Sequence, residues 1–280
     1  MQPRAASACS NNNHTIRMSP SFIFRIITLV MAVILTPMTS HASPRHPRPQ
    51  SIPQEYQRAS KHSFTSGTHV LPYRCFMENK ESAGAPHLLL LLHGRSGSGY
   101  DNTAQLSSPA LPSLLEYVKR HRIKCIILLP QCPPEQDWLS SGALDTAVLL
   151  AQKMSKRYNI NKQNCCISGV SMGGRAAYEA MLRQPRVFGK CLVVAGSAHG
   201  NKIQQAKGNF YIVHGEYDRT IPLDRALQTE QALRSNPRNN VKLRILPQMQ
   251  HIDSCLSGYD TAAWKWAFSP TNRKKRREEK

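Results

Sequence analysis

Three kinds of sequence signal are missing from the 280 residues of this chain. No two cysteines have the C-x-x-C spacing, so neither a zinc ribbon nor a dithiol redox site is predicted. No glycine-rich segment ends in Gly-Lys-Ser/Thr or follows G-x-G-x-x-G, which argues against the common phosphate-binding loops. No apolar run reaches the roughly 20 residues that a membrane-spanning helix needs. These absences leave no sequence signal for a metal, nucleotide or other cofactor.

Acidic residues are scarce, with 17 Asp and Glu against 37 Lys and Arg, a formal net charge of +20. A basic surface attracts nucleic acid, anionic lipid headgroups and anionic polymers. No helix-turn-helix pattern and no stripe of mixed aromatic and basic residues accompanies the charge, so specific nucleic-acid binding is not predicted. A host whose proteins are all basic is the simpler interpretation, and electrostatic contact with anionic envelope surfaces stays open.

The N-terminus has the order of a secretory signal peptide. Arg17 and Arg25 precede the apolar run 26–35, and 40–42 reads Ser-His-Ala, with small residues where a signal peptidase cleaves. We therefore expect residues 1–42 to be removed and the protein to be periplasmic or secreted. The alternative is an anchor formed by an uncleaved N-terminal helix.

Composition divides the rest of the chain into three parts. Residues 43–62 are rich in Pro, Arg and Gln and are expected to form a flexible linker. Residues 63–269 are long enough for one domain, and residues 270–280 form a basic tail.

Eight cysteines are present, and Cys9 lies in the expected signal peptide. Seven remain, so at least one thiol stays unpaired within a chain. Export permits disulfides, and Cys132 and Cys255, both in expected loops at the same edge, are the first pair to test.

Short apolar runs alternate with helical periodicity after the linker. Strands are predicted at 87–92, 125–129, 166–168, 191–194, 210–213 and 241–245, and helices at 112–121, 142–158, 173–184, 223–235 and 258–268. This alternation predicts a mostly parallel sheet covered by helices on both faces. The loops that follow the strands then meet at one edge, where ligands bind. Residues 195–209 are too few for a lid domain between two strands, so an open site is expected.

The strongest local motif is the run 169–173, Gly-Val-Ser-Met-Gly, between an expected strand and an expected helix. A sharp strand-to-helix turn makes a serine hydroxyl project toward a base, and it requires small residues two positions before and after the serine. This context favours Ser171 as a nucleophile over an ordinary glycine-rich turn.

An acid and a base follow later expected strands. Asp218 lies in the loop after 210–213, where a carboxylate could orient a histidine. Asp224 and Glu216 compete with it, but Glu216 is too close to the strand end. His251 follows the last expected strand and is the predicted base.

The order Ser, Asp, His along the chain is that of the α/β-hydrolase arrangement. His214 precedes the acid and is interpreted as structural. The glycines in 93–99 would let backbone N–H groups approach an oxyanion, and those of Met172 and Arg95 are the expected donors. Trp138, His199 and Tyr100 are candidates for lining a substrate pocket.

Several segments carry a family resemblance, namely His93-Gly94-Arg95-Ser96-Gly97-Ser98-Gly99, Asp101-Asn102, Gln105-Leu106, Leu129-Pro130-Gln131-Cys132, Trp138, Tyr158-Asn159-Ile160 and residues 169–174. They resemble the phospholipase/carboxylesterase-type and dienelactone-hydrolase-like branch of the α/β-hydrolases. They are also similar to secreted "predicted peptidase" and polyhydroxybutyrate-depolymerase-like esterases. The resemblance spans about residues 70–268 and implies an esterase core without a cofactor. Arg95 and Gln248-Met249-Gln250 depart from the pattern, which bears on the substrate rather than on the three catalytic positions.

The sequence thus predicts a serine hydrolase of carboxylic esters that acts through an acyl-enzyme on small substrates or on exposed polymer ends. Two alternatives remain open: a peptidase with the same residues, and a non-catalytic envelope binding protein that keeps the fold.

Overall fold

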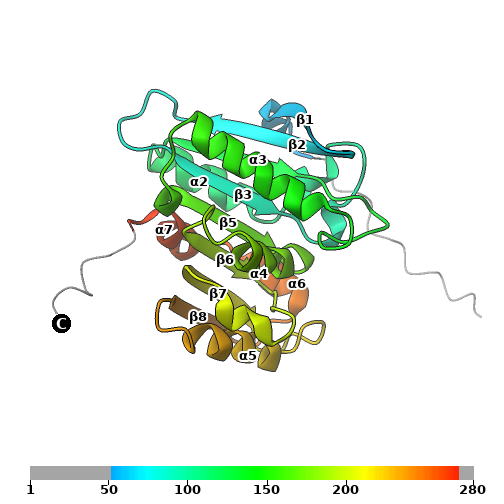
Figure 1. The fold of residues 1–280 in the computed structure, drawn as a ribbon, viewed down its shortest axis with the longest axis vertical. Helices are drawn as coiled ribbons and strands as arrows, with labels where there is room; N and C mark the ends of the chain where they lie inside the picture. The colour runs from blue at the N-terminus through cyan, green and yellow to red at the C-terminus, as the bar shows by residue number, and fades with distance from the viewer. Residues whose placement is uncertain (1–51, 271–280) are drawn as a thin grey trace, which may run out of the picture. The chain divides into compact units, whose positions relative to one another are not determined.

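A computed structural model describes residues 52–270, whose eight strands form one mixed sheet (Figure 1). The strands are β1 (Ser60–Ser66), β2 (His69–Glu78), β3 (His87–Leu92), β4 (Cys125–Pro130), β5 (Cys165–Val170), β6 (Lys190–Val194), β7 (Asn209–Gly215) and β8 (Asn240–Leu246). Their order in the sheet is β1-β2-β4-β3-β5-β6-β7-β8. The six strands from β3 to β8 are parallel to one another, and β1 and β2 are antiparallel additions at one edge.

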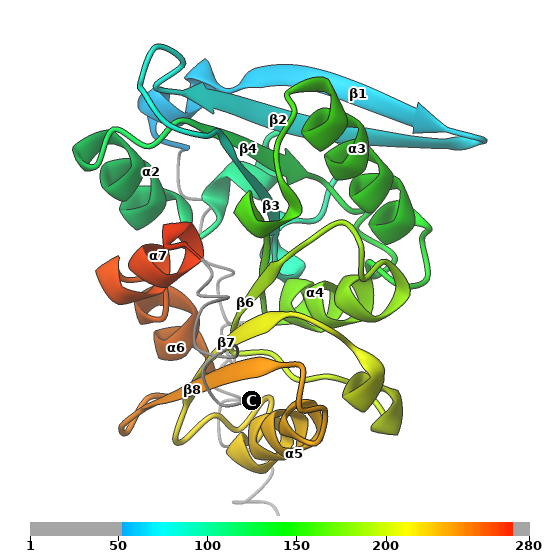
Figure 2. The ribbon, with the colours of Figure 1, turned by 60° about the vertical axis from the view of Figure 1, so that its left-hand side comes forward.

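Helices cover both faces of the sheet (Figure 2). They are α2 (Leu111–Arg120), α3 (Ala143–Arg157), α4 (Met172–Arg183), α5 (Leu223–Arg234), α6 (His251–Ser257) and α7 (Thr261–Phe268). Helices α3, α4 and α5 lie on one face, and α2, α6 and α7 lie on the other. Short 3-10 helices, η1 (Gln54–Arg58), η2 (Arg95–Gly97), η3 (Ala104–Ser107), η4 (Lys162–Asn164) and η5 (Asn201–Gln205), occur in the connections.

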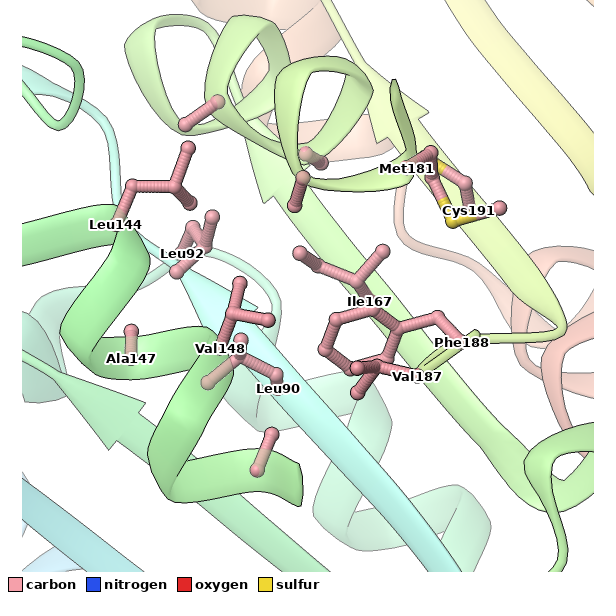
Figure 3. Close-up of a cluster of buried hydrophobic side chains, with 14 of the residues drawn as sticks. Leu90, Leu92, Leu144, Ala147, Val148, Ile167, Met181, Val187, Phe188 and Cys191 are labelled. Carbon is pink, nitrogen blue, oxygen red and sulfur yellow. The ribbon is translucent and has the colours of Figure 1, made fainter. Parts of the chain in front are cut away.

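The central strands are mostly apolar because both of their faces are covered. In β3, Leu90 and Leu92 point into the cluster beneath α3 and α4, which Figure 3 shows. Leu89 and Leu91 point the opposite way, toward α2 and α7. The two-residue period of a strand thus divides one leucine run between two cores.

The fold prediction is confirmed: the sheet is mostly parallel, and helices lie on both faces. Four predicted helices end within two residues of α2, α3, α4 and α5. The predicted final helix 258–268 corresponds instead to α7, with the separate α6 before it. The connection from β6 to β7 carries only the short η5.

The predicted linker 43–62 is wrong at its C-terminal end. Residues Gln54–Arg58 form η1, and β1 already begins at Ser60. Tyr56 is 6% exposed and packs in the core that includes α2 and α7, so this segment belongs to the folded unit. The predicted signal peptide, the first part of the predicted linker and the basic tail after residue 270 lie outside the described residues. Within residues 52–270 no helix is long and apolar enough to cross a membrane.

The suggested pairing of Cys132 with Cys255 is also wrong. All seven cysteines in the described range are unpaired. Cys132 is buried in the core on the α3 side of the sheet, whereas Cys255 packs against the core on the α2 side. The sheet therefore separates the two sulfur atoms.

Candidate active site

Ser171 occupies a tight turn between β5 and α4. Its φ of 52° and ψ of −116° lie in a region that non-glycine residues rarely adopt. The backbone N–H of Ser171 donates to Val194 O at the end of β6 (3.0 Å), and its carbonyl accepts from Gly174 N (2.9 Å) and Arg175 N. Bonds to a neighbouring strand and to the first turn of α4 hold the strained serine in place.

Two glycines make this turn possible. A Cβ at Gly169 would overlap the carbonyl of Gly173, and a Cβ at Gly173 would overlap the carbonyl of Leu92 in β3. The obstructing atoms are backbone atoms and cannot rotate away. The small residues that the sequence motif predicted are thus required by the packing of α4 against β5 and β3.

His251 links Ser171 to Asp218. Its Nε2 lies 3.0 Å from Ser171 Oγ, and its Nδ1 lies 2.7 Å from Asp218 Oδ2. The His251 side chain is 12% exposed and that of Asp218 is fully buried. The three side chains come from the ends of β5, β7 and β8, which are parallel, so their carboxyl ends share one edge of the sheet. The sequence positions predicted this meeting, but His251 is the first residue of α6 rather than a loop residue.

The Asp218 carboxylate is held by several donors. Oδ1 accepts from the N–H groups of Thr220 (2.9 Å) and Ile221 (2.8 Å), which leaves Oδ2 for His251. His214 also lies beside Oδ2, with its Nε2 at 3.4 Å, and the same nitrogen is 2.8 Å from Ile221 O. Burial lowers the pKa of His214, so the neutral ring donates from Nε2 and does not bring a second positive charge to the carboxylate.

The competing acids lie elsewhere. Glu216 Oε2 accepts from the backbone N–H of Gln248 (2.8 Å) and so joins the loops after β7 and β8. Asp224 is exposed in the first turn of α5. Asp218 is the acid that bonds His251 directly, at 2.7 Å.

The loop after β3 lies against the serine. A Cβ on Gly94 would be 3.7 Å from Ser171 Cβ. Within the described range, the backbone N–H groups of Arg95 and Met172 have no protein acceptor, and Met172 is the first residue of α4. Two free donors beside the hydroxyl are what an oxyanion would need. The positive end of the α4 dipole adds to them.

His93 fixes the shape of this loop, a role that the sequence did not reveal. Its Nδ1–H donates to Gly94 O (2.6 Å), and its Nε2 accepts from Cys132 N (3.0 Å). The indole N–H of Trp138 donates to His93 O at 3.1 Å. Burial lowers the pKa of His93 to about 4, which keeps Nε2 free to accept.

The three predicted pocket residues do not line the hollow at Ser171. Trp138 is completely buried: its indole N–H donates to the carbonyl of His93, and its ring packs in the core on the α3 side of the sheet. Tyr100 is 69% exposed and bonds Glu135 (2.7 Å) at the surface. His199 lines a separate, smaller hollow beside α4. These expectations are therefore corrected.

A cavity of about 1010 Å³ opens beside Ser171 and His251. Its walls come from η1, the loop after β3, the segment from η3 into α2, and α6. Sequence reasoning missed these walls. One signal was present: Ile252 and Leu256 are apolar at helical spacing directly after His251, in an otherwise polar stretch.

No group of three or more His, Cys, Asp or Glu side chains suited to a metal ion occurs among residues 52–270. The chemistry available at the site is that of a hydroxyl, an imidazole, a carboxylate and two N–H donors.

Comparison with known proteins identifies the fold to which this site belongs. No family model and no curated protein sequence matches the chain. Among solved structures, it is similar to a thermostable esterase, with a TM-score of 0.63 and 21% identity, covering 76% of this chain and 63% of that one. The chain thus spans less than two thirds of that protein.

Two further structures have the same architecture. A truncated carbohydrate esterase from gut microbiota has a TM-score of 0.57 at 13% identity, covering 76% of this chain and 95% of that one. The acylaminoacyl peptidase of Pyrococcus horikoshii has a TM-score of 0.52 at 12% identity, covering 71% and 39%. At such identities the likeness establishes the fold, and this chain has the α/β-hydrolase fold.

Proposed function

We propose that this protein is a serine hydrolase that cleaves carboxylic esters through an acyl-enzyme on Ser171. The observation that carries the proposal is the position of His251 between Ser171 Oγ (3.0 Å) and Asp218 Oδ2 (2.7 Å). The esterases among the structures of similar fold support the same chemistry.

In the first step, His251 Nε2 takes the proton of Ser171 as the hydroxyl oxygen attacks the ester carbonyl carbon. Asp218 accepts from Nδ1–H, keeps the ring in the required tautomer and stabilises the imidazolium. The N–H groups of Met172 and Arg95 stabilise the negative carbonyl oxygen, each contributing roughly 10²–10³ in rate.

Collapse of the tetrahedral intermediate breaks the bond to the alcohol, which takes its proton from His251. Water then attacks the acyl-enzyme, with His251 again accepting a proton, and the acid leaves as Ser171 is restored. None of these reaction steps requires a cofactor.

Replacing the nucleophile tests this proposal. Ser171→Ala should lower kcat for p-nitrophenyl butanoate by at least roughly 10⁴, because the remaining groups cannot form the acyl-enzyme. Ser235→Ala, which removes an exposed hydroxyl at the end of α5, should keep full activity.

A fluorophosphonate probe should label the wild-type protein at Ser171, as located by peptide mass spectrometry. An unlabelled protein would support the non-catalytic binding alternative and overturn the proposal.

A peptidase is the second candidate, favoured by the similarity to an acylaminoacyl peptidase. Esters and amides pass through the same kind of intermediate. Matched p-nitrophenyl esters and p-nitroanilides of one acyl group separate the two functions. Faster turnover of the anilide would reverse the order that we propose.

We further propose that the enzyme is exported after cleavage behind Ala42, on the basis of the leader composition. N-terminal sequencing of protein recovered outside the cytoplasm should begin at Ser43. An intact N-terminus on membrane-bound protein would favour the anchored alternative.

A further inference from the structure

The cavity beside Ser171 has apolar walls, which the reaction of Ser171 with an ester does not by itself require. Apolar side chains line most of it, among them Tyr56, Leu106, Pro109, Ile252, Leu256 and Tyr259. Within the described range no acidic side chain lines the cavity, and Arg95 is its only arginine or lysine. Because burial lowers its pKa to about 4, His93 stays neutral near pH 7. The lining therefore suits an uncharged, apolar group better than a charged one.

The mouth of the cavity exposes two large aliphatic side chains. Ile252 is 66% exposed and Leu256 is 64% exposed, four residues apart on α6 and hence on one side of that helix. Both belong to the cavity lining, on the same helix as His251. An apolar pair that leads from solvent to the nucleophile would gain from being covered by a bound apolar group.

We propose that this cavity binds the acyl part of the substrate, and that the enzyme prefers esters of apolar carboxylic acids longer than butanoic acid. This proposal rests on the function proposed above. The cavity volume of about 1010 Å³ lies at the upper end of ordinary ligand pockets, roughly 300–1,000 Å³, and far exceeds an acetyl group.

The order of bond changes assigns the cavity to the acyl group rather than to the alcohol. When Ser171 Oγ bonds to the carbonyl carbon, the bond to the alcohol breaks, and the alcohol leaves with a proton from His251. Water must then reach the same position. The alcohol side therefore needs a path to solvent, whereas the acyl group stays bound through both steps and benefits from an apolar enclosure throughout.

A chain-length series on the full-length protein tests the proposal. The kcat/KM of p-nitrophenyl octanoate should exceed that of p-nitrophenyl acetate by at least about 10-fold, since each fully buried methylene is worth up to about fourfold. All esters are used below their aggregation concentrations.

The outcomes separate the two proposals. If Ser171-dependent hydrolysis of the acetate equals or exceeds that of the octanoate, the acyl-pocket proposal is overturned and the hydrolase proposal stands. If no ester is hydrolysed in a manner that depends on Ser171, both are overturned.

Surface variants test the walls. The double variant Ile252→Ser/Leu256→Ser should lower the octanoate-to-acetate ratio of kcat/KM at least about fivefold. Leu227→Ser is the matched control, because Leu227 is an exposed leucine (41%) on α5 that does not line the cavity. It should leave the ratio unchanged. An unchanged ratio in the double variant would overturn the role of α6.

A second series varies the alcohol instead, with ethyl and octyl acetate as substrates. Similar kcat/KM values for the two acetates support the assignment of the cavity to the acyl group. A strong preference for octyl acetate would place the alcohol in the cavity and overturn that assignment.

Discussion

At the scale of single residues, the structure gives His214 a role in holding Asp218 in place. Its Nε2–H faces both Ile221 O (2.8 Å) and Asp218 Oδ2 (3.4 Å), so it ties the acid to its own loop. The other ring nitrogen, Nδ1, is buried without a partner, which fits a neutral ring that donates only from Nε2.

Replacing this ring should loosen Asp218. His214→Phe keeps an aromatic ring but loses the N–H, and leaving Ile221 O unpaired costs about 1–3 kcal/mol. We expect kcat to fall about 10-fold with KM nearly unchanged, and His214→Asn, which can still donate, to recover part of it. Wild-type kcat in the Phe variant, whatever its stability, would show that the contact does not position Asp218.

The sequence could locate the residues that follow predicted strands. Ser171 and Asp218 come after buried, mostly apolar strands, and His251 comes after β8, whose apolar residues alternate with basic ones. Parallel strands bring such positions to one edge of the sheet. Trp138 was misassigned because an aromatic residue near a site can either pack in the core or contact a substrate. Its indole N–H bonds His93 O inside the core, and residue type alone does not distinguish that use from contact with a substrate.

At the scale of elements, the approach of α4 to β3 decides whether the nucleophile turn forms. Gly173→Ala should lower the free energy of unfolding by more than about 2 kcal/mol, because the new methyl would overlap the carbonyl of Leu92. Gly94→Ala is the matched control. It adds the same methyl at 3.5 Å or more from its neighbours and at a negative φ. Urea unfolding of both variants measures the difference, and equal losses would contradict this packing argument.

Two of the elements that the sequence missed, β1 and α6, have weak periodicity. Strand β1 reads Ser-Lys-His-Ser-Phe-Thr-Ser and is mostly exposed at the sheet edge. Because neither of its faces is buried, its sequence has little alternation of apolar and polar residues. Helix α6 has only seven residues, with Gly258 as its C-cap, so it is too short for a helical pattern to stand out.

At the scale of the whole molecule, buried histidines make stability depend on pH. His93 has a pKa of about 4 when folded because it is buried, against about 6.5 when unfolded. Below pH 6.5 the unfolded chain therefore binds a proton that the folded chain does not. The free energy of unfolding should fall by up to about 3 kcal/mol between pH 6.5 and 4 from this residue.

Urea unfolding at pH 7, 6 and 5 measures that decline. Burial also lowers the pKa values of His87, to about 4, and of His214, so both add to the slope in the same direction. His93→Gln cannot titrate and should have a shallower slope than the wild type. An equal slope would show that His93 titrates normally in the folded protein.

The fold class was predictable because six strands, five of them largely buried, alternate with helices along most of the sequence. The cavity was not. Its walls join η1, the segment around η3, and α6, which are distant in sequence and are brought together by the fold. Only the α6 wall carried a signal, the helical spacing of Ile252 and Leu256.

The strand order divides the site unequally. Strands β3 and β5, which carry the oxyanion loop and Ser171, are neighbours at the centre of the sheet, whereas His251 follows β8, the last strand at one edge. Opening begins most readily at an edge. Mild heating should therefore detach the base first and leave an inactive protein that keeps most of its sheet, so that catalysis disappears before most of the circular dichroism signal of the backbone is lost.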